Sequence, residues 1–181
     1  MRIQPELSVG LLIDVQERLF PHIADYDVKQ TAMVKLIQGF DILGTPLMVT
    51  EQYVKGLGKT VTALDSIRSA HSPVFEKMSF SCCGSDAFLA HLAQSGRTTV
   101  ILFGIETHVC VLQTALDLLA AGYRVAVVED AVGSRHESDK QTALARMRQE
   151  GVLPVSVESI LLELCVTSGT STFKAISQLI K

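Results

Sequence analysis

Five short apolar runs that alternate with amphipathic stretches restrict the fold of this 181-residue chain more than any other feature. Nearly continuous apolar runs are typical of parallel strands that are covered on both faces. The stretches between them carry apolar residues near helical spacing. Strands that alternate with helices predict right-handed βαβ crossovers. We therefore expect an α/β fold of three layers, α/β/α, with a mostly parallel central sheet of five to six strands.

The boundaries of these runs define the expected elements. The predicted strands are Ser8–Asp14, Pro46–Thr50, Thr98–Gly104, Arg124–Asp130 and Leu153–Val157. The predicted helices are Val28–Leu43, Asp86–Gln94, His108–Ala121, Glu137–Glu150, Val157–Leu164 and Ser171–Ile180. A glycine follows each of the first four helices, where glycine commonly forms the C-terminal cap. No linker or repeat interrupts this series, so we expect a single domain over residues 1–181.

Composition and charge disfavour several classes of partner. The chain is 48% hydrophobic and 19% charged, a balance that is typical of a folded globular protein. A net charge of −3 and the lack of a long basic run disfavour nucleic acid and anionic membranes. No apolar stretch is long enough to span a bilayer, and the apolar N-terminal segment is too short for a signal peptide. We therefore expect a cytoplasmic protein that binds a small molecule.

Cys110 is the residue whose position points most directly to chemistry. It follows a buried run, a glycine and a polar loop, and lies in the first turn of a predicted helix that we expect Thr107 to cap. The N–H groups and the dipole at a helix N-terminus favour a thiolate and can hold an oxyanion. The alternative is a buried, inert cysteine, the usual environment of this residue.

Two charged residues fit a site around Cys110. Asp14 ends the uncharged run Val9–Ile13, and ligands of open α/β sheets bind at the carboxyl ends of strands. A carboxylate there can accept the thiol proton or hold a substrate amide. Lys77 lies in the apolar segment "PVFEKMSF", which predicts an inward ammonium that would stabilise a thiolate. The alternatives are a capping aspartate and a surface lysine that pairs with Glu76.

Other kinds of site have weak support. The five histidines are scattered and predict no metal site. The segment Gly56–Val61, "GLGKTV", lacks the spacing and the preceding strand of a phosphate-binding loop, so we expect no cofactor. The cysteines match neither a disulfide framework nor a zinc motif. Cys82 and Cys83 are typical of packing residues, although an exposed thiol there could be oxidised in a redox sensor.

Three segments, in order along the chain, resemble the isochorismatase-like cysteine hydrolases. They are Leu11–Leu19, Phe75–Ser81 and Gly104–Ser134, the last of which carries the signature G-x-x-T-x-x-C-V as Gly104, Thr107, Cys110 and Val111. Two further segments resemble more narrowly the isochorismatase-domain-containing branch, namely Thr50–Val61 and Phe173–Lys181. The resemblance rests on the ordered set of segments, which is specific to the family and spans nearly the whole chain.

The resemblance implies a catalytic triad of Asp14, Lys77 and Cys110. It also implies a cis peptide bond between Ile105 and Glu106, which would place the Glu106 N–H beside the Cys110 N–H as an oxyanion hole. Relatives in this family are commonly oligomeric, so a homo-oligomer is implied as well. The candidate substrate-binding residues adjoin strand ends or Lys77, and they are Gln16, Gln52, Tyr53 and Phe80.

Two departures from relatives narrow the implied activity. The nicotinamidase branch has an Asp-x-His metal site after the second strand, whereas this chain has "TEQYVKG" there. True isochorismatases cleave a vinyl ether and lack the cysteine. Cys110 therefore favours hydrolysis of a small amide-type C–N or acyl bond through a thioester. The alternatives are an isochorismatase-type ether hydrolase, an oligomeric binding protein with a vestigial triad, and a thiol redox sensor.

Overall fold

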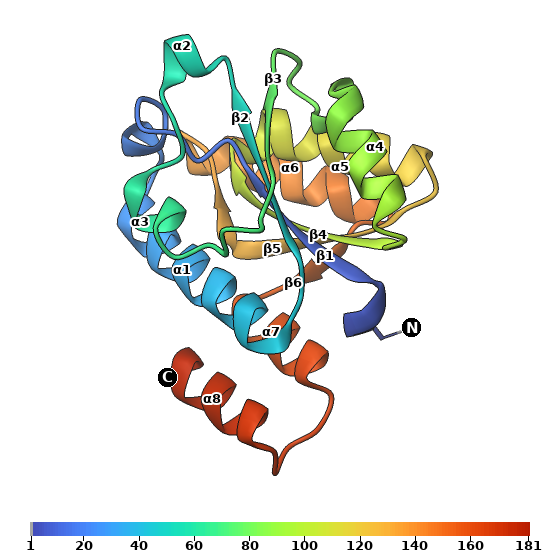
Figure 1. The fold of residues 1–181 in the computed structure, drawn as a ribbon. Helices are drawn as coiled ribbons and strands as arrows, with labels where there is room; N and C mark the ends of the chain where they lie inside the picture. Colours follow the sequence, from blue (N-terminus) through green and yellow to red (C-terminus); the bar gives the residue numbers. More distant parts are fainter. Residues whose placement is uncertain (1) are drawn as a thin grey trace.

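The computed structural model describes residues 2–181 and contains one six-stranded sheet (Figure 1). The strands are β1 (Ser8–Ile13), β2 (Leu47–Gln52), β3 (Val74–Lys77), β4 (Thr99–Ile105), β5 (Arg124–Gly133) and β6 (Leu153–Val155). All neighbouring strands pair in parallel, in the order β3-β2-β1-β4-β5-β6. The predicted fold class is confirmed, with six strands.

Helices cover both faces of the sheet. The longer ones are α1 (Tyr26–Leu43), α4 (Asp86–Gln94), α5 (Leu112–Ala120), α6 (Glu137–Gln149), α7 (Val157–Cys165) and α8 (Ser171–Ile180). In Figure 1, α1, α7 and α8 lie on one side and α4, α5 and α6 on the other, and each side holds its own buried apolar cluster. Within residues 2–181, no helix has both the length and the apolar character of a membrane span.

The elements differ from the prediction in several places. The sequence predicts only an extended segment around Lys77, and this segment pairs with β2 as the edge strand β3. β5 continues through Glu129 and Asp130 to Gly133, so these acids do not end a strand. Two helices of four residues each, α2 (Val54–Leu57) and α3 (Thr62–Asp65), lie where none is predicted, because so short a helix leaves no periodic pattern.

The strand register brings three predicted site segments to one edge of the sheet. Ile13 of β1 pairs with Thr50 of β2 and with Gly104 of β4. Gln52 at the end of β2 pairs with Lys77 at the end of β3. Because parallel strands end at the same edge, the residues that follow β1, β2 and β4 meet where open α/β sheets bind ligands.

Gly104 lies at a close contact between β1 and β4. Its φ of 117° is in the region that favours glycine, and an added Cβ would lie 2.3 Å from the carbonyl oxygen of Ile13. Backbone packing next to Asp14 therefore requires the glycine of the sequence signature.

Candidate active site

A buried ion pair between Asp14 and Lys77 lies at the carboxyl edge of the sheet. Asp14 directly follows β1 and has a φ of 53°, which few residues other than glycine adopt. Lys77 Nζ lies 2.6 Å from Asp14 Oδ2, and both side chains are fully buried. Lys77 also donates to the carbonyl oxygens of Ser79 at 3.0 Å and Phe80 at 2.9 Å. These three contacts match the three hydrogens of its ammonium.

Burial and ion pairing shift the pKa values of Asp14 and Lys77 in opposite directions. Burial raises the pKa of Asp14 above its usual value, although the Lys77 ammonium and the Thr50 hydroxyl act to lower it. Burial acts to lower the pKa of Lys77, but the Asp14 carboxylate outweighs this effect, and the pKa of Lys77 is raised. Lys77 therefore stays charged near neutral pH. Asp14 binds a proton more readily than an exposed aspartate, which suits a general base.

Thr50 holds the second oxygen of Asp14, and Cys82 in turn contacts Thr50. Thr50 Oγ1 donates to Asp14 Oδ1 at 2.8 Å and lies 3.6 Å from Cys82 Sγ. Because the single Thr50 proton is used on the carboxylate, the Cys82 thiol is the donor to Thr50. Burial raises the pKa of Cys82 to about 12, so Cys82 remains a thiol. Sequence reasoning missed both residues: Thr50 has only its place at a strand end as a signal, and Cys82 resembles a packing residue.

Cys110 lies in a π-helical turn, Thr107–Val111, that leads into α5. The predicted cap is wrong: Glu106 precedes the turn, and the buried Thr107 hydroxyl has no hydrogen-bond partner in the described part of the chain. Single π-helical turns are uncommon and often occur at functional sites. The peptide bond between Ile105 and Glu106 is cis.

The Cys110 thiol is coupled electrostatically to the ion pair but is not a ready thiolate. Its sulfur lies 3.4 Å from Gln52 Oε1 and interacts with the Asp14 carboxylate. Burial raises the pKa of Cys110, and the Asp14 charge adds to this effect, while Lys77 acts to lower it. A position near a helix N-terminus favours a lower pKa, but Cys110 is only 4% exposed and its burial has the largest effect on the pKa. The resting residue therefore needs a base.

A pocket of about 230 Å³ opens onto Cys110. Its lining residues are Leu19, Gln52, Tyr53, Leu57, Phe80, Glu106, Val109 and Cys110. Three of the four residues predicted to bind substrate, Gln52, Tyr53 and Phe80, line this pocket. The fourth, Gln16, is fully buried outside this lining, and its Nε2 donates to the carbonyl oxygens of Gln52 and Gly58. Through its hydrogen bonds with the Gln52 backbone, Gln16 positions the end of β2.

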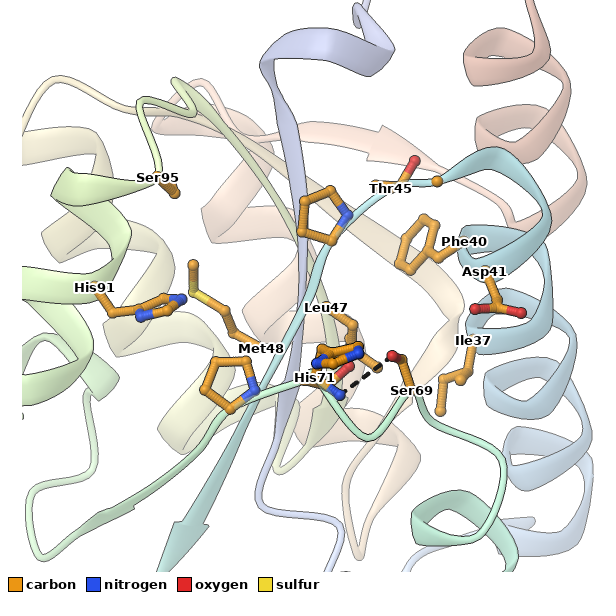
Figure 2. Close-up of a pocket in the computed structure, with 14 residues that line it drawn as sticks. Ile37, Phe40, Asp41, Thr45, Leu47, Met48, Ser69, His71, His91 and Ser95 are labelled. Atoms are coloured by element: carbon orange, nitrogen blue, oxygen red, sulfur yellow. Dashed lines mark hydrogen bonds between the residues drawn. The ribbon is translucent and has the colours of Figure 1, made fainter.

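A second pocket, of about 280 Å³, lies at the opposite end of β2 (Figure 2). In Figure 2, His91 and Asp41 are on opposite sides, with Met48 and Leu47 between them. Across residues 2–181, no three His, Cys, Asp or Glu side chains are grouped to hold a metal ion. Asp14, Lys77 and Cys110 do not line this pocket, so the candidate active site is the one at the carboxyl edge of the sheet.

The fold and the site together define a class: an α/β/α protein with a buried Asp–Lys pair and a thiol at the carboxyl edge of its parallel sheet. The chain belongs to the isochorismatase family, since the sequence model of the isochorismatase domain matches residues 8–159. The resemblance found in the sequence is thereby confirmed.

Relatives share both sequence and fold. Isochorismatase domain-containing protein 1 of Salmo salar is 42% identical over 177 residues, which are 98% of this chain. The chain spans 62% of the length of that protein. The structure of the MAR1 ribonuclease from Caenorhabditis elegans is 39% identical, with a TM-score of 0.94 over 99% of this chain and 92% of that one. The YcaC gene product of Escherichia coli, described as an octameric hydrolase of unknown specificity, shares the fold at 22% identity, with a TM-score of 0.92 over 99% of this chain and 90% of that one.

Proposed function

We propose that the protein hydrolyses a small amide-type C–N or acyl bond through a thioester on Cys110. The observation that carries this proposal is the buried Asp14 carboxylate, which Lys77 and Thr50 hold beside the Cys110 thiol. A buried ion pair is weak evidence for a role in stability, because well-packed apolar residues of similar volume often stabilise a fold equally well. A fixed carboxylate with a raised pKa next to a protonated nucleophile is the arrangement that general-base catalysis requires.

In the first half of the proposed reaction, Asp14 takes the proton of Cys110 as the sulfur attacks the carbonyl carbon. The new C–S bond moves an electron pair onto the carbonyl oxygen, and the N–H groups of Glu106 and Cys110 hold this oxyanion. Asp14 then gives its proton to the leaving nitrogen, the C–N bond breaks, and ammonia or an amine departs. The acyl group remains on the sulfur as a thioester.

In the second half, water attacks the thioester and gives a proton to Asp14. The C–S bond breaks, the carboxylic acid leaves, and the proton on Asp14 returns to the Cys110 sulfur. The sum is amide plus water to acid plus ammonia or amine, without a cofactor or a metal. Lys77 keeps its charge throughout and holds Asp14 in position.

A substrate panel with matched cysteine variants tests this proposal. The panel contains small amides and esters, isochorismate, and a short RNA, because one relative is named a ribonuclease. We expect amide or ester hydrolysis that Cys110→Ser reduces on the order of a thousandfold or more. Cys165→Ser is the control, because Cys165 ends α7 outside the site. Cleavage of RNA or of isochorismate that survives Cys110→Ser would contradict the proposal, and inactivity on the whole panel would favour a binding protein.

We also propose a homo-oligomer in the cytoplasm. The Escherichia coli relative is described as octameric. Tyr53, Met78 and Phe80 are large apolar side chains that are more than half exposed near the pocket. The cysteines of the described residues are free, which fits a reducing compartment. Light scattering of the wild type and of Met78→Lys tests the assembly, and we expect the variant to dissociate.

A further inference from the structure

The pocket above Cys110 offers no cation to a ligand. Five of its lining side chains are apolar or aromatic: Leu19, Tyr53, Leu57, Phe80 and Val109. The other three are Gln52, Glu106 and Cys110, so no lining residue is basic. An anionic group that entered this pocket would lose its water without gaining a counter-ion, which is costly.

Lys77, the ammonium of the site, has no donor left for a substrate. Its Nζ donates to Asp14 Oδ2 and to the carbonyl oxygens of Ser79 and Phe80, and an ammonium has three hydrogens. Its charge is already matched by Asp14 at 2.6 Å. A substrate carboxylate would have to break this pair to reach it.

Glu106 is the one charged side chain in the lining of this pocket. Its Oε1 accepts hydrogen bonds from Nε of Arg135 at 3.0 Å and from the Arg135 backbone N–H at 3.2 Å. The Glu106 side chain is 9% exposed, whereas that of Arg135 is 57% exposed and lies outside the pocket lining. The ion pair therefore neutralises Glu106 from the solvent side and presents no positive charge to the cavity.

Gln52 is the neutral polar group that remains for a ligand. Its Oε1 lies 3.4 Å from Cys110 Sγ and its Nε2 lies 3.4 Å from the carbonyl oxygen of Met78. The contact with Met78 is long for an N–H···O hydrogen bond, and a side-chain amide carries two donor hydrogens and an acceptor. This amide can donate to or accept from an uncharged amide that is placed against the sulfur.

We propose that the substrate is a small, uncharged amide whose acyl group is apolar, and that substrates with a carboxylate on the acyl group are rejected. This inference rests on the hydrolase function proposed above and names its substrate class. The cavity of about 230 Å³ lies below the range of roughly 300–1,000 Å³ that holds drug-sized ligands, which fits an acyl chain of a few carbons. The same charge pattern excludes isochorismate, which carries two carboxylates.

The test compares 4-methylpentanamide with succinamate. The two compounds have the same number of non-hydrogen atoms and differ only in an isopropyl group against a carboxylate. We expect kcat/KM to favour 4-methylpentanamide by roughly tenfold or more. Leu57→Lys, which adds a cation to the lining, should raise kcat/KM for succinamate relative to 4-methylpentanamide, and Leu57→Met is its matched control. Equal rates, or a preference for succinamate in the wild type, would overturn the inference.

Binding to Cys110→Ala, measured by calorimetry with the same two compounds, separates this inference from the hydrolase proposal. If the wild type hydrolyses neither amide but Cys110→Ala binds 4-methylpentanamide more tightly, the hydrolase proposal fails and the pocket assignment stands. If Cys110→Ala keeps the native circular dichroism spectrum and binds neither compound, or binds succinamate at least as well, the pocket assignment fails.

Discussion

At the scale of single residues, the surroundings of Asp14 determine what the site can do. Burial raises the pKa of this carboxyl, and the Lys77 ammonium and the Thr50 hydroxyl oppose that effect. The base must be ionised to accept the Cys110 proton, so activity should be lost as the pH falls through the pKa of Asp14. Because this pKa is raised, we expect the acid limb of the rate profile to lie above the usual aspartate value of 3.8.

Replacing Thr50 by valine should move that limb. The Thr50 hydrogen bond lowers the pKa of Asp14, so its loss raises this pKa further, and ionisation then requires a higher pH. We expect the acid limb of kcat/KM in Thr50→Val to shift to higher pH than in the wild type. Thr50→Ser keeps the hydroxyl and should restore the wild-type profile. An unchanged limb in Thr50→Val would show that the hydroxyl does not tune Asp14.

At the scale of secondary structure elements, the contact of β1 with β4 sets the geometry of the site. We expect Gly104→Ala to destabilise the protein by about 3 kcal/mol or more, because the new methyl group meets the Ile13 backbone at a positive φ. Urea unfolding measures this loss. Gly96→Ala is the control, since its φ of 66° is also positive but nothing lies within 4 Å of the added carbon. Equal losses of unfolding free energy in both variants would show that the positive φ alone, and not the contact with Ile13, causes the destabilisation.

The sequence predicted the elements that have a repeating pattern and missed those that do not. The apolar runs that became β1 and β4 are buried at every position, which is why they could be recognised. The π-helical turn at Cys110 and the edge strand β3 depend on tertiary contacts that no local pattern encodes. The same limit applies to the site. Asp14 and Lys77 could be named from the sequence, but the direction in which the pKa of Cys110 shifts depends on its burial in the fold.

At the scale of the whole molecule, the buried ion pair links stability to pH. Lys77→Met leaves Asp14 buried without its partner, which should cost about 3–5 kcal/mol near neutral pH. Without Lys77, the folded-state pKa of Asp14 rises further above its unfolded value. The folded state then binds a proton more tightly, so the contribution of Asp14 to stability is fully present at low pH and is lost as the pH rises through its folded-state pKa.

Urea unfolding of Lys77→Met at neutral and mildly acidic pH measures this dependence. The loss relative to the wild type should be smaller in acid, and the double variant Asp14→Asn, Lys77→Met should recover most of it, because no charge remains buried. A loss that does not change with pH would show that the missing Lys77 stem, rather than the unpaired carboxylate, causes the instability.

The pH dependence of Cys110 alkylation by iodoacetamide, followed by mass spectrometry, tests most directly the claim that the Asp14–Lys77 pair controls the Cys110 proton. Asp14 raises the pKa of Cys110 and Lys77 lowers it. Relative to the wild type, we therefore expect the labelling midpoint to move to lower pH in Asp14→Asn and to higher pH in Lys77→Met. Cys165, in the same samples, serves as the reference thiol. If both variants label Cys110 with the wild-type midpoint, the three residues do not form a coupled site and the proposed mechanism is wrong.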